Sequence, residues 1–264
     1  MNPGNMSPNF DLSAANRGAW SFHLFGVWVR VQIWLWIILL ILAGERDPRD
    51  VLIWVAVCFV SLLLHEFGHV VAFRLFGVDS AVILQAWGGL TAPRRDLHGA
   101  MPNTLVALAG PAAGFLLVGV VLIAGYFTGF QIRVGWHLFL PSLSVLPPGG
   151  APLQASLPYY WLVALNDFLF VNLYWGILNL IPVYPLDGGQ VARAVIEERD
   201  PYGGRKRSLI LSAVAGAAAA LVGVALKNLL MVMLFGLLAG LSAMEAERTR
   251  GGRRPYRPGE GKWR

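Results

Sequence analysis

His65, Glu66 and His69 form a His-Glu-x-x-His pattern inside an apolar run, residues 62–70. On an α-helix, residues four apart project from the same side, so the imidazoles of His65 and His69 can bind one metal ion. Glu66 is rotated by about 100° from His65. Its carboxylate therefore points toward the open coordination position of the metal, where a base can activate water. The pattern predicts a metal centre that performs hydrolysis.

The helix that must position these side chains is predicted over residues 51–76 and is otherwise almost wholly apolar. A soluble helix can carry two histidines and a glutamate on a wet face at little cost. Inside a bilayer, by contrast, a charged side chain costs about 2.5–3.5 kcal/mol or more unless it is paired or binds a metal. Ionisable residues in such a helix therefore indicate function.

The composition is that of an integral membrane protein, with 56% hydrophobic and 14% charged residues and a mean hydropathy of +0.58. We expect an all-α polytopic membrane protein with about six transmembrane helices, each close to the length that crosses a bilayer. The expected spans are residues 27–43, 51–76, 103–127, 159–181, 208–226 and 228–244.

Short strands are predicted beside two of these spans. Residues 20–32 are rich in aromatic and β-branched residues around Gly26, and residues 80–93 suggest a strand, a turn at Gly88-Gly89 and a return strand. Three connections are predicted to lack regular structure: the charged turn 44–50, the apolar loop 128–158 that would lie against the membrane, and the mixed-charge loop 190–207.

A single membrane-embedded domain is predicted over residues 20–244. It would be flanked by a polar N-terminal tail, residues 1–19, and by a basic, disordered tail, residues 245–264.

The distribution of basic residues predicts the orientation. With the N-terminus in the cytoplasm, all but four of the 21 lysines and arginines fall on the cytoplasmic side, the exceptions being Arg46, Arg49, Arg133 and Lys227. Both termini are therefore expected in the cytoplasm, and in a prokaryote the membrane would be the plasma (inner) membrane. The net charge of +6 favours anionic membrane lipids as partners of the basic loops and tail, and no nucleic acid is expected.

A third metal ligand is suggested by the segment that follows the fourth span. Pro182 and Pro185 are expected to stop the helix, so that Asp187 projects from irregular backbone before Gly188-Gly189. A catalytic zinc ion has three protein ligands and one open position, and two histidines with one carboxylate match that rule. The alternative is an ordinary aspartate in a surface turn.

Two asparagines of the fourth span, Asn172 and Asn179, are seven residues apart and share a helix face. They could donate hydrogen bonds to the carbonyl of the bond that is cut, or they could join neighbouring helices. Asp167 lies either near the outer surface or in the cavity of the site.

With both motifs in view, residues 22–194 resemble the site-2 protease family, whose members are zinc metalloproteases that cut inside the membrane. The resemblance depends on the order and separation of several motifs: His65-Glu66-Phe67-Gly68-His69, Gly77, Trp87-Gly88-Gly89, Ala109-Gly110-Pro111, Asn179-Leu180-Ile181-Pro182 and Leu186-Asp187-Gly188-Gly189. In one departure, Gly114 occupies a position where family members often have asparagine, which concerns a helix contact and not the metal.

The resemblance implies that His65, His69 and Asp187 bind Zn²⁺, that Glu66 is the catalytic base and that Asn179 helps to bind the substrate carbonyl. The implied activity is hydrolysis of peptide bonds in or near transmembrane segments of membrane-protein substrates. Two other classes are weighed against it. One is a non-catalytic membrane adaptor that binds transmembrane helices through a relic zinc site, and the other is a metal transporter, because ionisable residues within spans also mark ion pathways.

Overall fold

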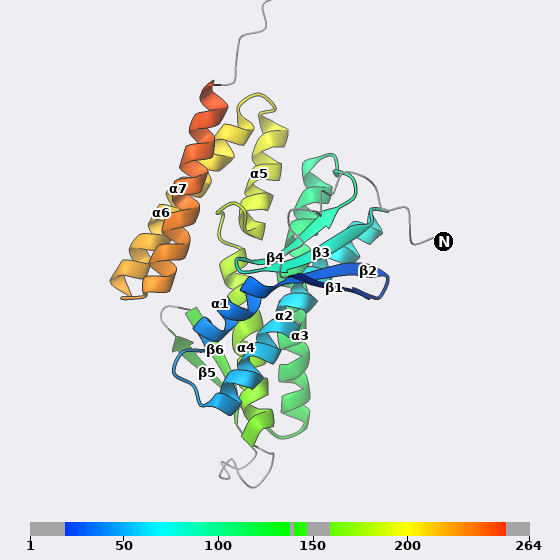
Figure 1. Cartoon of the computed structure of the whole chain (residues 1–264), viewed down its shortest axis with the longest axis vertical. Coiled ribbons are helices and arrows are strands. Elements are labelled where there is room, and N and C mark those ends of the chain that lie inside the picture. The colour runs from blue at the N-terminus through cyan, green and yellow to red at the C-terminus, as the bar shows by residue number, and fades with distance from the viewer. Residues whose placement is uncertain (1–18, 138–139, 147–158, 252–264) are drawn as a thin grey trace, which may run out of the picture. The chain divides into compact units, whose positions relative to one another are not determined.

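The computed structural model describes residues 19–137, 140–146 and 159–251 (Figure 1). Most of the two predicted tails and part of the predicted loop 128–158 lie outside these residues. Five helices of the described chain are long and apolar enough to cross a membrane, as a polytopic protein requires. They are α2 (Pro48–Leu75), α3 (Ala100–Phe127), α4 (Tyr159–Asn179), α6 (Gly204–Ala225) and α7 (Leu229–Gly251).

The first expected span, residues 27–43, differs from the expectation. Its first part is strand β2 (Val27–Gln32), and only α1 (Ile33–Ala43) is helical. The β-branched residues Val27, Val29 and Val31 alternate along the chain and are fully buried in the core shared with α1 and α2, on one face of a strand that pairs with two neighbours, which favours extended backbone. The 11 residues of α1 rise by about 16 Å, roughly half of the ~30 Å hydrocarbon core.

A four-stranded sheet with the order β1-β2-β3-β4 accompanies the helices. The predicted strand pair at residues 20–32 is present as β1 (Ala19–Leu24) and β2, joined by Phe25 and Gly26, which both have positive φ as a tight hairpin turn requires. Strand β3 (Ser80–Gln85) pairs in parallel with β2, and β4 (Gly88–Pro93) pairs antiparallel with β3. Strand β4 is therefore an edge strand.

The turn between β3 and β4 was predicted at Gly88-Gly89 but is formed by Ala86 and Trp87, because Gln85 already pairs with Gly88. The glycines serve close packing instead. A Cβ added at Gly88 would lie 3.2 Å from the Trp175 ring. The Gly88-Gly89 pair, which was interpreted as a turn, therefore belongs to a strand against which large side chains pack.

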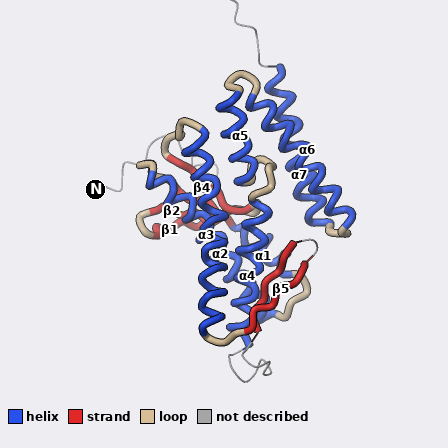
Figure 2. Tube along the Cα trace, turned by 180° about the vertical axis from the view of Figure 1, so that it is seen from behind, coloured by secondary structure: helices blue, strands red, loops and turns tan. Residues whose placement is uncertain are grey.

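The described chain divides into two compact units, and the first consists of its residues within 19–96 and 109–176. It contains the sheet, α1, α2 and most of α3 and α4, and its core joins β2 and β3 to α1 and α2. The described part of the loop 128–158 forms a hairpin of β5 (Gln131–His137) and β6 (Leu140–Leu146) (Figure 2). The Asn166 side chain holds β6 against α4 by bonding the N–H and C=O of Val145.

The second unit consists of residues 97–108 and 177–251 of the described chain. Helices α6 and α7 share a core with the segment that follows α4. The buried residues of this core are Val183 of that segment and Phe235 and Leu238 of α7. The predicted loop 190–207 is wrong except at residues 200–203, because α5 (Asp187–Arg199) is a helix and α6 already begins at Gly204. The partly buried pair Arg193–Glu197, four residues apart on α5, stabilises a helix rather than a loop.

Candidate metal centre

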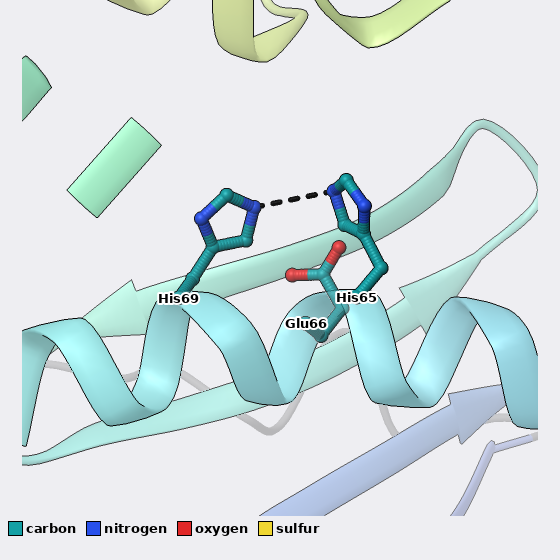
Figure 3. Close-up of side chains that lie close together, drawn as sticks. All are labelled: His65, Glu66 and His69. Atoms are coloured by element: carbon teal, nitrogen blue, oxygen red, sulfur yellow. Dashed lines mark hydrogen bonds between the residues drawn. The ribbon is translucent and has the colours of Figure 1, made fainter. Parts of the chain in front are cut away.

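Helix α2 carries His65, Glu66 and His69 near its middle, and all three side chains are buried. Both imidazoles rise from the same side of the helix and face each other, with the Glu66 carboxylate between them (Figure 3). The two Nε2 atoms are 3.3 Å apart. The nearest ligand atoms of the three residues all lie within 4.8 Å of one another.

The spacing of the two imidazoles fits a zinc ion. Tetrahedral zinc at about 2.0–2.1 Å from each nitrogen places two nitrogen ligands about 3.3–3.4 Å apart, and the observed Nε2–Nε2 distance is 3.3 Å. A hydrogen bond between the rings has a similar length. The two buried imidazoles can supply two nitrogen ligands for zinc, and the Glu66 carboxylate lies beside them, where a base can act on zinc-bound water.

The backbone of helix α3 packs directly against the imidazoles. A Cβ at Gly110 would lie 2.7 Å from the Nε2 atom of His65 and closer still to that of His69. One turn away from His65, Gly68 allows α2 to approach α3, because a Cβ there would lie 2.5 Å from the carbonyl oxygen of Ala109. Close helix packing was predicted from residues 109–114. The direct contact of Gly110 with the two imidazoles was missed.

Strand β4 contacts Glu66 of the motif. The Thr91 hydroxyl lies 2.7 Å from Oε2 of Glu66 and 3.2 Å from the Glu66 carbonyl oxygen. A Cβ at Gly89 would overlap the Glu66 carboxyl group. Sequence reasoning did not identify Thr91, and the only signal available was its place two residues after Gly89, on the same face of a predicted strand.

Asn172 joins two helices of the first unit. Its amide donates to the Ser61 hydroxyl of α2 and to the Phe168 carbonyl of its own helix, both at 2.9 Å. Of the two predicted roles, the structure supports the interhelical bond. Gly114, the departure from the family pattern, lies against this residue, because its Cβ would be 3.5 Å from Oδ1 of Asn172.

Asp167 also has a structural partner. Arg46 donates to both of its carboxylate oxygens, at 3.0 and 2.9 Å. Asp167 is buried in the first half of α4, and its cation comes from the charged turn 44–50.

Asp187 and Asn179 belong to the second unit, and both are buried. Asp187 is the first residue of α5 and not part of irregular backbone, which corrects the expectation. Gly188 and Gly189 allow this first helical turn to pack against the backbone of residues 180–184. A carboxylate in the first turn is favoured by the helix dipole. The roles of Asp187 as a ligand and of Asn179 as a carbonyl donor stay predictions.

The fold and the site together define a multi-pass membrane protein with a His-Glu-x-x-His metal centre on a spanning helix. Residues 53–223 match the sequence model of peptidase family M50, so the chain belongs to this family, which includes the site-2 proteases. The family resemblance inferred from the motifs is confirmed.

Similar proteins include zinc metalloprotease MJ0392 of Methanocaldococcus jannaschii, 28% identical over 83% of this chain and 53% of the relative. Rip3 of Mycobacterium tuberculosis is 32% identical over 69% of this chain and 39% of the relative. The chain thus spans about half the length, or less, of these curated relatives. Among solved structures, the site-2 protease from Methanocaldococcus jannaschii shares the fold, with a TM-score of 0.56 and 20% identity, covering 90% of this chain and 100% of that one.

Proposed function

We propose that this chain is an intramembrane zinc metalloprotease that hydrolyses peptide bonds in or near transmembrane segments of membrane proteins. The observation that carries the proposal is the pair of Nε2 atoms, 3.3 Å apart, with the Glu66 carboxylate beside them on a spanning helix. Membership of peptidase family M50 supports the same activity.

His65 and His69 would hold the zinc ion through their Nε2 atoms. When bound, zinc supplies the Lewis acidity that makes water and the scissile carbonyl reactive at neutral pH. Glu66 takes the proton of the attacking water and then gives it to the leaving amine. Burial of the site keeps bulk water away from Glu66, which strengthens its interaction with these reacting groups.

The third ligand and the carbonyl donor are proposed from the second unit. Asp187 would complete a set of two histidines and one carboxylate, which leaves one position for the reaction. Asn179 would donate a hydrogen bond to the carbonyl oxygen as negative charge develops there. Both residues are buried and polar at the two ends of the segment that links α4 to α5, which supports functional roles for them.

The substrate would have to leave its helical conformation to reach the site, because helical peptide bonds are hydrogen-bonded and shielded. Strand β4 supports this step, since an edge strand offers backbone groups with which an unwound segment can pair. Glu66 contacts this same strand through Thr91.

The orientation is proposed from the basic residues, with both termini in the cytoplasm and, in a prokaryote, in the plasma membrane. Exposed arginines such as Arg94, Arg95 and Arg207 would then face the cytoplasmic leaflet and attract anionic lipids.

The Glu66→Gln variant tests the activity. It removes the base and keeps the size of the side chain, so we expect zinc to bind at one ion per chain and kcat to fall by a factor of about 10²–10⁴. The measurement is cleavage of a transmembrane substrate by the purified protein in proteoliposomes, with zinc quantified in the same sample.

Glu197→Gln is the matched control, because Glu197 lies on α5, where it pairs with Arg193 of the same helix. This variant should cleave like the original protein. Unchanged cleavage by Glu66→Gln would refute the proposed function. If no transmembrane substrate is cut by the original protein while it still captures such segments, the non-catalytic adaptor is supported instead.

A further inference from the structure

We propose that Thr91 is a positioning residue that holds the Glu66 carboxylate in the orientation required of the base. The inference rests on the proposed function, because it assigns a role in that reaction. It begins with the hydrogen bond of 2.7 Å between the Thr91 hydroxyl and Oε2 of Glu66, which joins strand β4 to helix α2.

The hydroxyl has one proton and two oxygen neighbours on Glu66. The carboxylate oxygen is at 2.7 Å and the backbone carbonyl oxygen at 3.2 Å. A hydroxyl bond to a charged acceptor is shorter and stronger than one to a neutral acceptor, and 2.7 Å lies at the length expected for it. The Thr91 hydroxyl therefore donates its hydrogen bond to the carboxylate. Thr91 thus constrains the end of the Glu66 side chain and not only its backbone.

Gly89 restricts the same carboxyl group from a second direction. Residues 89 and 91 lie on one face of β4, and a Cβ at Gly89 would overlap Cγ, Cδ and Oε1 of Glu66. The carboxyl group thus rests directly on the strand backbone at one oxygen and accepts a hydrogen bond at the other. Free rotation of the terminal carboxylate, which is broad in an unconstrained glutamate, is limited in this arrangement.

Strand β4 is firmly held, as a support for a catalytic group must be. It pairs with β3 along its whole length, from Gly88 to Pro93, and its first residue packs against the Trp175 ring of α4. The other edge of β4 is the one proposed to pair with the substrate. The strand that aligns the base would therefore also align the peptide bond that it serves.

Removing the hydroxyl tests this role. Thr91→Val keeps the shape, and Thr91→Ala removes the bulk as well. Because small misplacements of catalytic groups cost rate rather than binding, we expect both to lower kcat by about 10- to 100-fold, with KM within about twofold and one zinc ion still bound per chain. Thr91→Ser keeps the donor and should retain most of the kcat.

Ser80→Ala is the matched control on β3 of the same sheet. Its hydroxyl is buried and has no hydrogen-bond partner among the described residues, so its removal should leave kcat unchanged. A kcat that is unaffected in both Thr91→Val and Thr91→Ala would overturn the proposal. An equal loss in Thr91→Ser would overturn it as well, because packing and not the hydrogen bond would then be responsible.

A thermal measurement gives a readout that does not depend on activity. In the zinc-bound protein, Thr91→Val should lower the melting temperature more when Glu66 is present than in a Glu66→Ala background, where only the contact with the backbone carbonyl remains. An equal effect in both backgrounds would assign Thr91 a merely structural role. If Glu66→Gln retains cleavage, the proposed function fails; if Glu66→Gln is inactive and the Thr91 variants are not impaired, only the present inference fails.

Discussion

At the scale of single residues, the candidate metal centre depends on the missing side chain at Gly110 of α3 as much as on the histidines of α2. Gly110 lies beside the Nε2 atoms of both histidines, at the place where any side chain would approach them. A helical glycine lowers helix stability by about 0.5–1 kcal/mol relative to alanine. Its presence at this position is explained by the close approach of the α3 backbone to the two imidazoles, which leaves no space for a side chain.

Gly110→Ala should therefore abolish zinc binding while the protein remains folded. The new Cβ would lie 2.7 Å from Nε2 of His65 and nearer to that of His69, so the imidazoles would have to move apart. At a free zinc concentration of about ten times the original Kd, we expect zinc below about one tenth of an ion per chain, which corresponds to an affinity loss of about 100-fold or more. Metal analysis after gel filtration checks this.

Gly119 on the same helix provides the control, because a Cβ there would have no neighbour within 4 Å. Gly119→Ala should bind zinc normally and keep or slightly raise the melting temperature. Full zinc occupancy in Gly110→Ala would contradict the place assigned to the ion.

At the scale of elements, the charged turn 44–50 does more than connect two helices, although it was interpreted as a solvated turn. Arg46 holds Asp167 of α4 through two hydrogen bonds and lies 4.5 Å over the Trp54 ring of α2. Arg49 donates to the Tyr160 hydroxyl. The turn therefore joins the start of α2 to the start of α4, the two helices that Asn172 also connects.

Arg46→Gln should destabilise the protein by about 1–3 kcal/mol, because it leaves Asp167 without its cation. The side chain of Asp167 is only 9% exposed and that of Arg46 is 35% exposed. The cost should accordingly be less than the ~3–5 kcal/mol of breaking a fully buried pair. Denaturant unfolding in mixed micelles, followed by circular dichroism, measures it.

The comparison variant is Arg205→Gln, which breaks a pair with Glu245 whose side chains are 57% and 40% exposed. Its cost should stay below about 1 kcal/mol, because solvent screens such pairs. Equal stability losses in the two variants would show that the Arg46–Asp167 pair contributes no more than a surface pair.

At the scale of the whole molecule, the proposed enzyme uses residues of both compact units. His65, Glu66 and His69 belong to the first unit, and Asp187 and Asn179 to the second. The first unit by itself supplies two nitrogen ligands and the base. A catalytic zinc site requires a third protein ligand, and Asp187 is the residue that we propose for it.

Loss of a residue that hydrogen-bonds to a metal ligand weakens metal binding by about 10–100-fold. Asp187→Ala removes the proposed ligand itself, so it should weaken zinc binding by more than this. Competition with a chelating dye measures the affinity. Glu197→Gln removes a carboxylate from the same helix α5 and should bind zinc like the original protein. An unchanged affinity in Asp187→Ala would exclude this residue as a ligand.

The sequence by itself determined the membrane class, the long apolar helices, the hairpin at residues 20–32 and the convergence of His65 and His69. Each depends on hydropathy or on the helical repeat, which act over a few neighbouring residues. The same local logic misplaced two boundaries. The valines of β2 are apolar enough for a span but are buried in a sheet, and the glycines of β4 resemble a turn but serve close packing.

Only the tertiary structure decided which residues support the site. Thr91 is 25 residues from Glu66 along the chain, and Asn172 is 111 residues from its partner Ser61. Gly110 matters because another helix places two imidazoles against it. Such contacts depend on how strands and helices pack against one another. No periodicity within one segment predicts them, because the same threonine, asparagine or glycine elsewhere would be an ordinary strand or helix residue.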